Sequence, residues 1–268
     1  MQEMKVHSLY FSATGTTAKV VGAIASAAAK TLAADVACHD VTPVTSRKGS
    51  LEFTGSDLVI FGVPVYIGRV PNLIKPWLET IKGGGAFGVP VVVYGNRAYD
   101  DALLELYDMM TACGFICTAA AAFVGEHSFS RTLGAGRPDA ADLQAAASFG
   151  ERVAHLREPL ASSLPGRRPA QFYKALDDEG KPFDIRKAKP ETDLSLCNGC
   201  GICVAVCPMG SISISEPSSV EGICIKCGAC IKKCPSGAKR FTDPEYLRHL
   251  SILERDYTSG RKLPEFFF

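Results

Sequence analysis

The sequence predicts an α/β protein in two parts, a doubly wound sheet of five parallel strands followed by a small, cysteine-rich α+β unit. Three observations lead to this fold class. Short apolar runs alternate with helical patterns through the first 160 residues, as in sheets that carry helices on both faces. Eight cysteines occur in two copies of one spacing between positions 197 and 234. The 268 residues are 47% hydrophobic and 21% charged, which is ordinary for a globular chain of about two domains.

The strands and helices of the predicted sheet follow one another along the chain. The strands are residues 5–11, 34–39, 57–62, 89–94 and 115–124, and the helices are residues 16–30, 71–81, 100–113 and 139–157. Pro76 interrupts the second helical pattern, and Trp77 beside it is expected in the core. Pro138 precedes Asp139, which we expect at the N-terminus of the last helix.

The first strand leads into a loop rich in hydroxyl groups. Ligands of doubly wound sheets lie beyond the carboxyl ends of the strands, which is where this loop falls. Its candidate binding residues are Ser12, Thr14, Gly15, Thr16 and Thr17. Backbone N–H groups and the helix dipole at such a place can hold a phosphate. Because the loop has no lysine, it is not a nucleotide-triphosphate loop, and it suits the phosphate of a mononucleotide. The alternative is a helix cap made of hydroxyl groups.

Three further loops lie at the same edge. The second loop has two glycines and two prolines and offers Pro64, Val65, Tyr66, Ile67 and Gly68. The third offers Gly95, Asn96, Arg97, Tyr99 and Asp100. Tyr66 and Tyr99 are candidates for contact with a flat ligand; alternatively, Tyr66 packs on its own prolines and Asp100 only caps the next helix. The fourth loop carries His127, a candidate proton donor near neutral pH, or a loop histidine bonded to the backbone.

Residues 1–160 resemble a flavodoxin. Ser12, Thr14, Gly15 and Thr17 match the phosphate loop T/S-x-T-G-x-T of that family, and Thr16 stands where asparagine is common. The resemblance implies a bound FMN whose ring lies between the second and third loops. Neither of these loops contains the tryptophan of a typical flavin cover, so the aromatic groups there are tyrosines.

The eight cysteines form two motifs of the spacing C-x2-C-x2-C-x3-C, each followed by proline and offset by 27 residues. Zinc is the alternative metal for such cysteine pairs, but a zinc site leaves the third cysteine and the proline of each motif unexplained. The motifs resemble those of bacterial ferredoxins with two [4Fe–4S] clusters, in which the fourth cysteine of each motif binds the other cluster. The resemblance implies that cluster one takes Cys197, Cys200, Cys203 and Cys234, and cluster two takes Cys224, Cys227, Cys230 and Cys207.

The expected domains are residues 1–160, a connector at 161–190, a cluster-binding domain at 191–242, and a C-terminal segment at 243–268. That last segment is expected to hold a helix at 244–255 and an aromatic tail, Phe266–Phe268, that docks on the body or on a second chain. The remaining cysteines, Cys38, Cys113 and Cys117, are expected to be small core residues.

Charge and hydropathy limit the possible partners. The net charge is +1, so no nucleic acid or anionic membrane is indicated. Five basic residues in or after the second motif form either a face that steers an acidic redox partner or a merely solvated one: Lys226, Lys232, Lys233, Lys239 and Arg240. The N-terminus lacks the features of a secretory signal, and no apolar run reaches the roughly 18 residues of a membrane span. A cytoplasmic location is therefore expected.

The whole chain resembles the flavodoxin–ferredoxin fusion proteins of anaerobic microbes. This resemblance implies an electron-transport flavoprotein that passes single electrons between two [4Fe–4S] clusters and FMN. Its expected partner is a redox protein, either a ferredoxin, a flavodoxin or a reductase, and the chain itself is a monomer or a homodimer. The alternative is an FMN-dependent reductase of a small molecule, in which the clusters only supply electrons. A third interpretation is that the first half holds no flavin.

Overall fold

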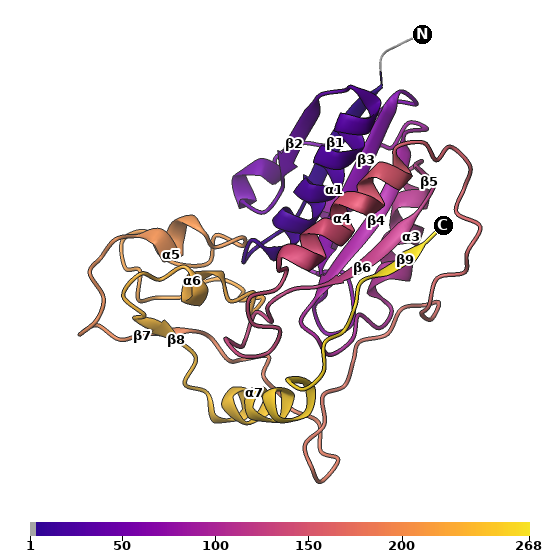
Figure 1. Ribbon diagram of the computed structural model, residues 1–268. Helices are drawn as coiled ribbons and strands as arrows, with labels where there is room; N and C mark the ends of the chain where they lie inside the picture. The colour runs from indigo at the N-terminus through magenta and orange to yellow at the C-terminus, as the bar shows by residue number, and fades with distance from the viewer. Residues whose placement is uncertain (1–3) are drawn as a thin grey trace.

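The computed structural model describes residues 4–268, so the expectation about a secretory signal at the N-terminus falls partly outside the described residues. Its main sheet has the order β2-β1-β3-β4-β6 (Figure 1), and these strands pair in parallel. They are β1 (Lys5–Tyr10), β2 (Val36–Asp40), β3 (Asp57–Pro64), β4 (Phe87–Tyr94) and β6 (Ala120–Val124). The short β5 (Ile116–Cys117) pairs with β4 ahead of β6, so both belong to the predicted fifth strand. Counted in this way, the order is that of flavodoxin-like sheets, which confirms the predicted fold class.

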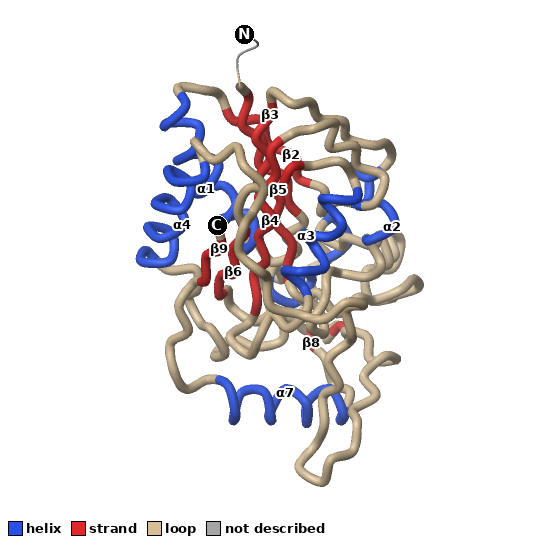
Figure 2. The backbone as a smooth tube through the Cα atoms, turned by 90° about the vertical axis from the view of Figure 1, so that its right-hand side faces the viewer, coloured by secondary structure: helices blue, strands red, loops and turns tan. Residues whose placement is uncertain are grey.

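Helices cover both faces of the sheet (Figure 2). One face packs against α1 (Thr16–Leu32) and α4 (Ala140–Val153), and the other against α2 (Lys75–Leu78) and α3 (Ala102–Ala112). Each face has its own buried apolar core. The side chain of Asp139 accepts hydrogen bonds from the N–H groups of Ala141 and Asp142, so this residue begins α4 as predicted.

Three details differ from the sequence prediction. The helix expected at 71–81 is only the four residues of α2, because Pro76 cannot donate a helical hydrogen bond and clashes with the preceding turn. Trp77 is half-buried, not enclosed in the core, and its indole N–H donates to the carbonyl of Gly49 at 2.7 Å. Cys38 is exposed on the edge strand β2, whereas Cys117 is buried and Cys113 half-buried.

The cysteine-rich part repeats one unit twice. Each motif contains a short helix, α5 (Ile202–Ala205) in the first and α6 (Ala229–Lys232) in the second. Each helix follows a glycine in the left-handed conformation, Gly201 with φ 69° and Gly228 with φ 73°. The ends of the unit are closed by an antiparallel pair of strands, β7 (Glu191–Thr192) and β8 (Lys239–Arg240). Matching backbone geometry in both motifs is what a sequence duplication predicts.

The cysteine-rich part packs directly on the sheet. Cys227 and Ala229 belong to the same buried apolar cluster as the core beneath α2 and α3. Arg47 donates a hydrogen bond to the carbonyl of Pro208. The second motif is therefore joined to the first 160 residues through a shared core and does not hang from a free linker.

The end of the chain returns to the sheet. After α7 (Pro244–Tyr257), the strand β9 (Glu265–Phe267) pairs antiparallel with β6 (Figure 1). The ring of Phe266 stacks on Phe149, with centroids 5.0 Å apart. The tail thus covers an otherwise unpaired sheet edge. Among residues 4–268, no helix is both long enough and apolar enough to cross a bilayer.

Candidate functional site

The loop after β1 leads into the start of α1 and is the candidate phosphate site. The N-cap residue of the helix is Gly15, with φ 93°, which has no side chain that could accept a hydrogen bond from the first turn. Ser12 Oγ accepts a hydrogen bond from Ala18 N at 3.0 Å. The Oγ1 atom of Thr17 is buried and has no hydrogen-bond partner among the described residues. It lies beside a small hollow that Thr14 and Thr16 also line. Buried hydroxyls are rarely left unpaired, so this arrangement fits a phosphate group.

The second loop is held rigidly by a buried carboxylate. Glu105 accepts hydrogen bonds from Arg69, from Lys75 at 3.1 Å and from the N–H of Val70 at 3.1 Å. Burial acts to raise the pKa of Glu105, but these bonds hold it below its ordinary value. The loop that carries Tyr66 therefore has a fixed position relative to α3.

The third loop contributes fewer residues to the site than predicted. Tyr99 is 8% exposed, and its hydroxyl donates to Glu265 of β9 at 2.7 Å, so it lies against the tail and not at the hollow. The amide of Asn96 donates to the carbonyl of Tyr257 at 2.7 Å. Asp100 pairs with Arg97, and Asp101, not Asp100, is the residue that precedes α3. Gly95 and Arg97 remain at the site.

A cavity of about 640 Å³ opens next to the phosphate hollow. The two spaces share walls made by Val65, Tyr66, Tyr94, Gly95, His127 and Ser128. Ile67 and Gly68 also line the cavity, and Pro64 lines the hollow. The opposite walls come from outside the sheet: Tyr173 and Phe183 of the connector, His249 of α7, and Cys224 to Lys226 of the second cysteine motif. A volume in this range is typical of small-molecule and cofactor sites.

His127 is a neutral hydrogen-bonding group in this cavity. Its Nδ1 accepts a hydrogen bond from Phe129 N at 3.1 Å, so the proton of the neutral ring is on Nε2. Burial, and then the charge of Lys232 and the neighbouring His249, lower the pKa of His127 to about 3. A pKa this low does not favour the role of His127 as a proton donor near neutral pH, which stays a prediction, as does a hydrogen bond from Nε2 to a ligand.

His249 is a site residue that the sequence did not reveal. It is 8% exposed, its Nδ1 has no hydrogen-bond partner within residues 4–268, and burial lowers its pKa. No motif surrounds it, and its place at the cavity depends on how α7 packs. The aromatic residues of the connector gave the sole sequence signal that this segment packs on something.

Four cysteines from both motifs line one small apolar cavity. They are Cys207, Cys224, Cys227 and Cys230, the set that the ferredoxin resemblance assigns to cluster two. Cys224 also lines the large cavity, and burial and then the neighbouring Cys227 and Cys224 raise the pKa of Tyr66. Cluster two would therefore lie beside the cavity. The other four cysteines are half-buried or, at Cys200, exposed.

A cluster site differs from a single-ion site in how closely its donor groups must approach one another. Within residues 4–268, no three His, Cys, Asp or Glu side chains converge closely enough to hold one metal ion. The four thiolates of a [4Fe–4S] cluster bind four different iron atoms, so they do not need to converge on one point. The donor set of four cysteine thiolates is that of such clusters.

The predicted basic face is largely used inside the molecule. Lys226 lines the cavity and donates to the carbonyl of Arg186 at 2.9 Å. Lys239 is 3% exposed and donates to Pro217 O at 2.7 Å, and Lys232 binds the loop around His127. This leaves Lys233 and Arg240 exposed, the latter paired with Asp193.

Comparison with known proteins identifies the cysteine-rich part. Residues 196–238 match the family model described as 4Fe-4S dicluster domain, so this part of the chain is a domain with two [4Fe–4S] clusters. No match is found among curated protein sequences.

Solved structures resemble the other part. A flavodoxin from the domain Archaea has 16% identity, covers 56% of this chain and 96% of its own, and gives a TM-score of 0.41. A flavodoxin of Streptococcus pneumonia TIGR4 has 16% identity, 56% and 97% coverage, and a TM-score of 0.39. The Flv1 flavodiiron core of Synechocystis sp. PCC6803 has 18% identity and a TM-score of 0.40; the match covers 57% of this chain and 36% of that core. The assignment of the fold rests on the strand order and not on these scores.

Proposed function

We propose that this fusion of a flavodoxin-like sheet with a 4Fe-4S dicluster domain passes single electrons between its two clusters and a bound FMN. One observation carries the proposal. Tyr66 of the second loop and Cys224 of the second cysteine motif line the same cavity. A ligand held by the sheet there would lie next to a ligand of cluster two, and short separations favour electron transfer.

The residues at the sheet edge fit FMN. The N–H groups at the start of α1 and the unpartnered hydroxyl of Thr17 would hold the phosphate. Tyr66, Tyr94 and Gly95 would border the ring, and His127 would donate a hydrogen bond from Nε2. When bound, FMN supplies the exchange between two-electron and one-electron chemistry. The enclosing walls would keep bulk water away from the ring.

Cluster one is the proposed point of contact with an external redox protein. Its ligand Cys200 is exposed, whereas Cys227 of cluster two is buried against the sheet. An electron entering at cluster one would therefore reach the cavity through cluster two. We further propose that the protein works in the cytoplasm in anaerobic metabolism, where reduced thiols persist.

The proposal is tested by anaerobic purification and a count of iron, sulfide and FMN per chain. About eight irons and one FMN are expected from two four-iron clusters and one flavin site. A one-electron donor protein should then bleach both the clusters and the flavin. Four irons, or a chain that takes up no FMN, would overturn the proposal.

A second candidate function is the FMN-dependent reduction of a small molecule. The observation that favours it is the roof of the cavity, formed by Tyr173, Phe183 and His249. This roof hinders a protein partner from reaching the flavin but leaves a cavity of about 640 Å³. Two electrons from the clusters and two protons from water would reduce the bound molecule.

The two functions differ in what reoxidises the reduced flavin. Small oxidants should react faster than a flavodoxin or ferredoxin if the cavity is a substrate site. In that case His249→Ala, which opens the roof, should bring the rates of flavin reoxidation by small oxidants and by protein acceptors closer together. If protein acceptors react faster in the unaltered chain, the second candidate function is wrong.

A further inference from the structure

Lys232 joins the dicluster domain to the loop that walls the phosphate hollow. It lies between Cys230 and Cys234 on the sequence, at the end of α6. Its ammonium group donates to the carboxylate of Glu126, to His127 O at 2.7 Å and to Ser130 O at 2.6 Å. All three of its protons are therefore used, and its side chain is only 10% exposed.

The loop held by Lys232 is part of the proposed flavin site. Glu126, His127 and Ser128 line the hollow next to Thr17. The two segments also meet closely here, since a Cβ on Gly228 of α6 would lie 2.4 Å from Ser128 O. Any shift of α6 would therefore move the wall of the hollow.

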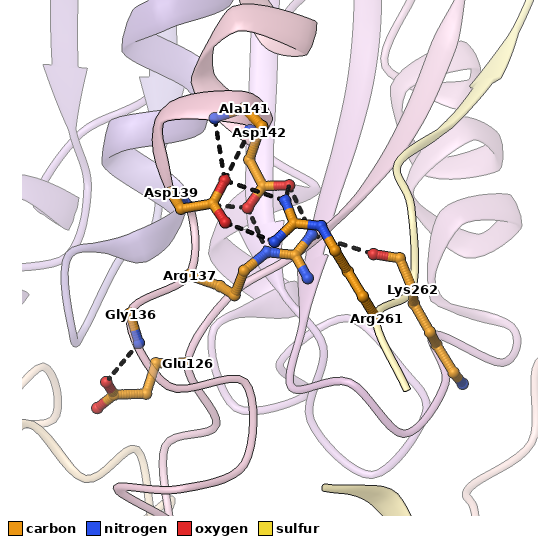
Figure 3. Close-up of polar contacts among 8 residues, drawn as sticks. All are labelled: Glu126, Gly136, Arg137, Asp139, Ala141, Asp142, Arg261 and Lys262. Carbon is orange, nitrogen blue, oxygen red and sulfur yellow. Dashed lines mark hydrogen bonds and ion pairs between the residues drawn. The ribbon is translucent and has the colours of Figure 1, made fainter. Parts of the chain in front are cut away.

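Other ion pairs hold the far end of this loop. They do not involve Glu126, whose carboxylate pairs with Lys232. Arg137 pairs with Asp142 and donates to Lys262 O at 3.1 Å, while Arg261 pairs with Asp139 (Figure 3). Figure 3 also shows Glu126 apart from this group, with a long contact of 3.5 Å from Gly136 N. Among the described residues, Lys232 is the only cation paired with the Glu126 carboxylate.

We propose that Lys232 is a positioning residue that couples the dicluster domain to FMN binding. By holding Glu126, His127 and Ser130, it fixes the loop against α6 and so fixes the wall of the hollow at a set distance from cluster two. The inference rests on the proposed FMN site. Coupling between two sites is reciprocal, so bound FMN should in turn protect the clusters.

The test compares Lys232→Met with Lys233→Met in the anaerobically purified full chain. Lys233 is exposed, and its substitution removes the same charge one residue away without breaking these bonds. We expect Lys232→Met to bind FMN about tenfold or more weakly, within the usual range of coupling between sites, and to shift the FMN midpoint potential. FMN should slow iron loss to a chelator in the unaltered chain and in Lys233→Met, but much less in Lys232→Met.

Two further variants separate positioning from general instability. Lys232→Arg keeps a cation and several donors and should restore part of the FMN affinity. Glu126→Gln keeps the shape of the loop but not its charge, and it should weaken FMN binding even if Lys232→Met loses its iron. The inference fails if the unaltered chain binds FMN and both Lys232→Met and Glu126→Gln leave affinity, potential and iron protection unchanged. If the unaltered chain binds no FMN, it is the proposed function that fails.

Discussion

At the scale of single residues, removal of the Thr17 hydroxyl should affect protein stability and FMN binding in opposite directions. It is buried beside the phosphate hollow and has no hydrogen-bond partner in the described part of the chain. Thr17→Val removes an unpaired polar atom at nearly constant volume, so the flavin-free protein should keep its free energy of unfolding or gain up to about 1 kcal/mol. FMN affinity should fall about tenfold or more, because a hydrogen bond to a charged phosphate is lost. Denaturant unfolding and FMN titration measure the two effects.

Thr118 provides a matched control for this experiment. Its Oγ1 is also buried and, among the residues that the structure describes, has no hydrogen-bond partner. It borders neither the hollow nor the large cavity. Thr118→Val should therefore change stability in the same direction and leave FMN affinity alone. Equal loss of FMN in both variants would mean that the Thr17 hydroxyl has no role in holding the phosphate.

The buried imidazole of His127 makes stability depend on pH. Its pKa is lowered to about 3 in the folded protein, against about 6.5 in an unfolded chain. Below pH 6.5 the unfolded chain binds a proton that the folded chain does not, so stability falls as the pH drops from 6.5 toward 3. Between pH 7.5 and 5.5 this loss is about 1.4 kcal/mol.

His127→Asn should remove that part of the pH dependence, because an amide can still accept the Phe129 N–H but does not titrate. His249, whose pKa is also lowered, should continue to contribute. Anaerobic denaturant titrations at the two pH values measure the loss. A loss of the same size in wild type and variant would show that His127 is protonated normally in the folded state.

At the scale of elements, the C-terminal tail acts as a sheet strand. Phe266 stacks on Phe149 and meets Phe123 at 5.7 Å. We expect Phe266→Ala to lower the free energy of unfolding by about 2 kcal/mol, less than for an enclosed phenylalanine because its ring is 38% exposed. Leu263→Ala, at a residue that is 68% exposed just before β9, should change stability by no more than about 0.5 kcal/mol. Thermal or denaturant unfolding distinguishes the two; equal losses would mean that the aromatic stack does not hold the tail.

The five parallel strands and the loops at their carboxyl ends could be predicted because local patterns determine them. A continuous apolar run such as Val59–Phe61 has few alternatives to a buried strand, and strand direction then gathers the loops at one edge. Side chains whose positions depend on distant segments could not be predicted. Tyr99 points to Glu265 of β9, and Lys232 is buried by a loop about a hundred residues earlier in the chain. Neither pairing leaves a mark in the local sequence.

At the scale of the whole molecule, the predicted exchange of cysteines between motifs decides which substitutions should disturb the cluster proposed beside the cavity. Cys207 comes from the first motif but shares a small cavity with Cys224, Cys227 and Cys230 of the second. If it is a ligand of cluster two, Cys207→Ser should resemble Cys224→Ser and not Cys197→Ser. The first two variants should slow the reduction of FMN by an external electron donor, because the cluster proposed beside the cavity would be the one that they damage.

The same experiment includes the corresponding variants of cluster one. Cys234→Ser should resemble Cys197→Ser, since both cysteines are assigned to cluster one, and this pair should leave the spectrum of cluster two intact. Electron paramagnetic resonance of the reduced variants, together with iron counts, shows which cluster each serine disturbs. A match of Cys207→Ser with Cys197→Ser would mean that each motif binds its own cluster. Cys224 would still hold cluster two beside the cavity, so the proposed order of the electron path, from exposed Cys200 through cluster two, would be unchanged.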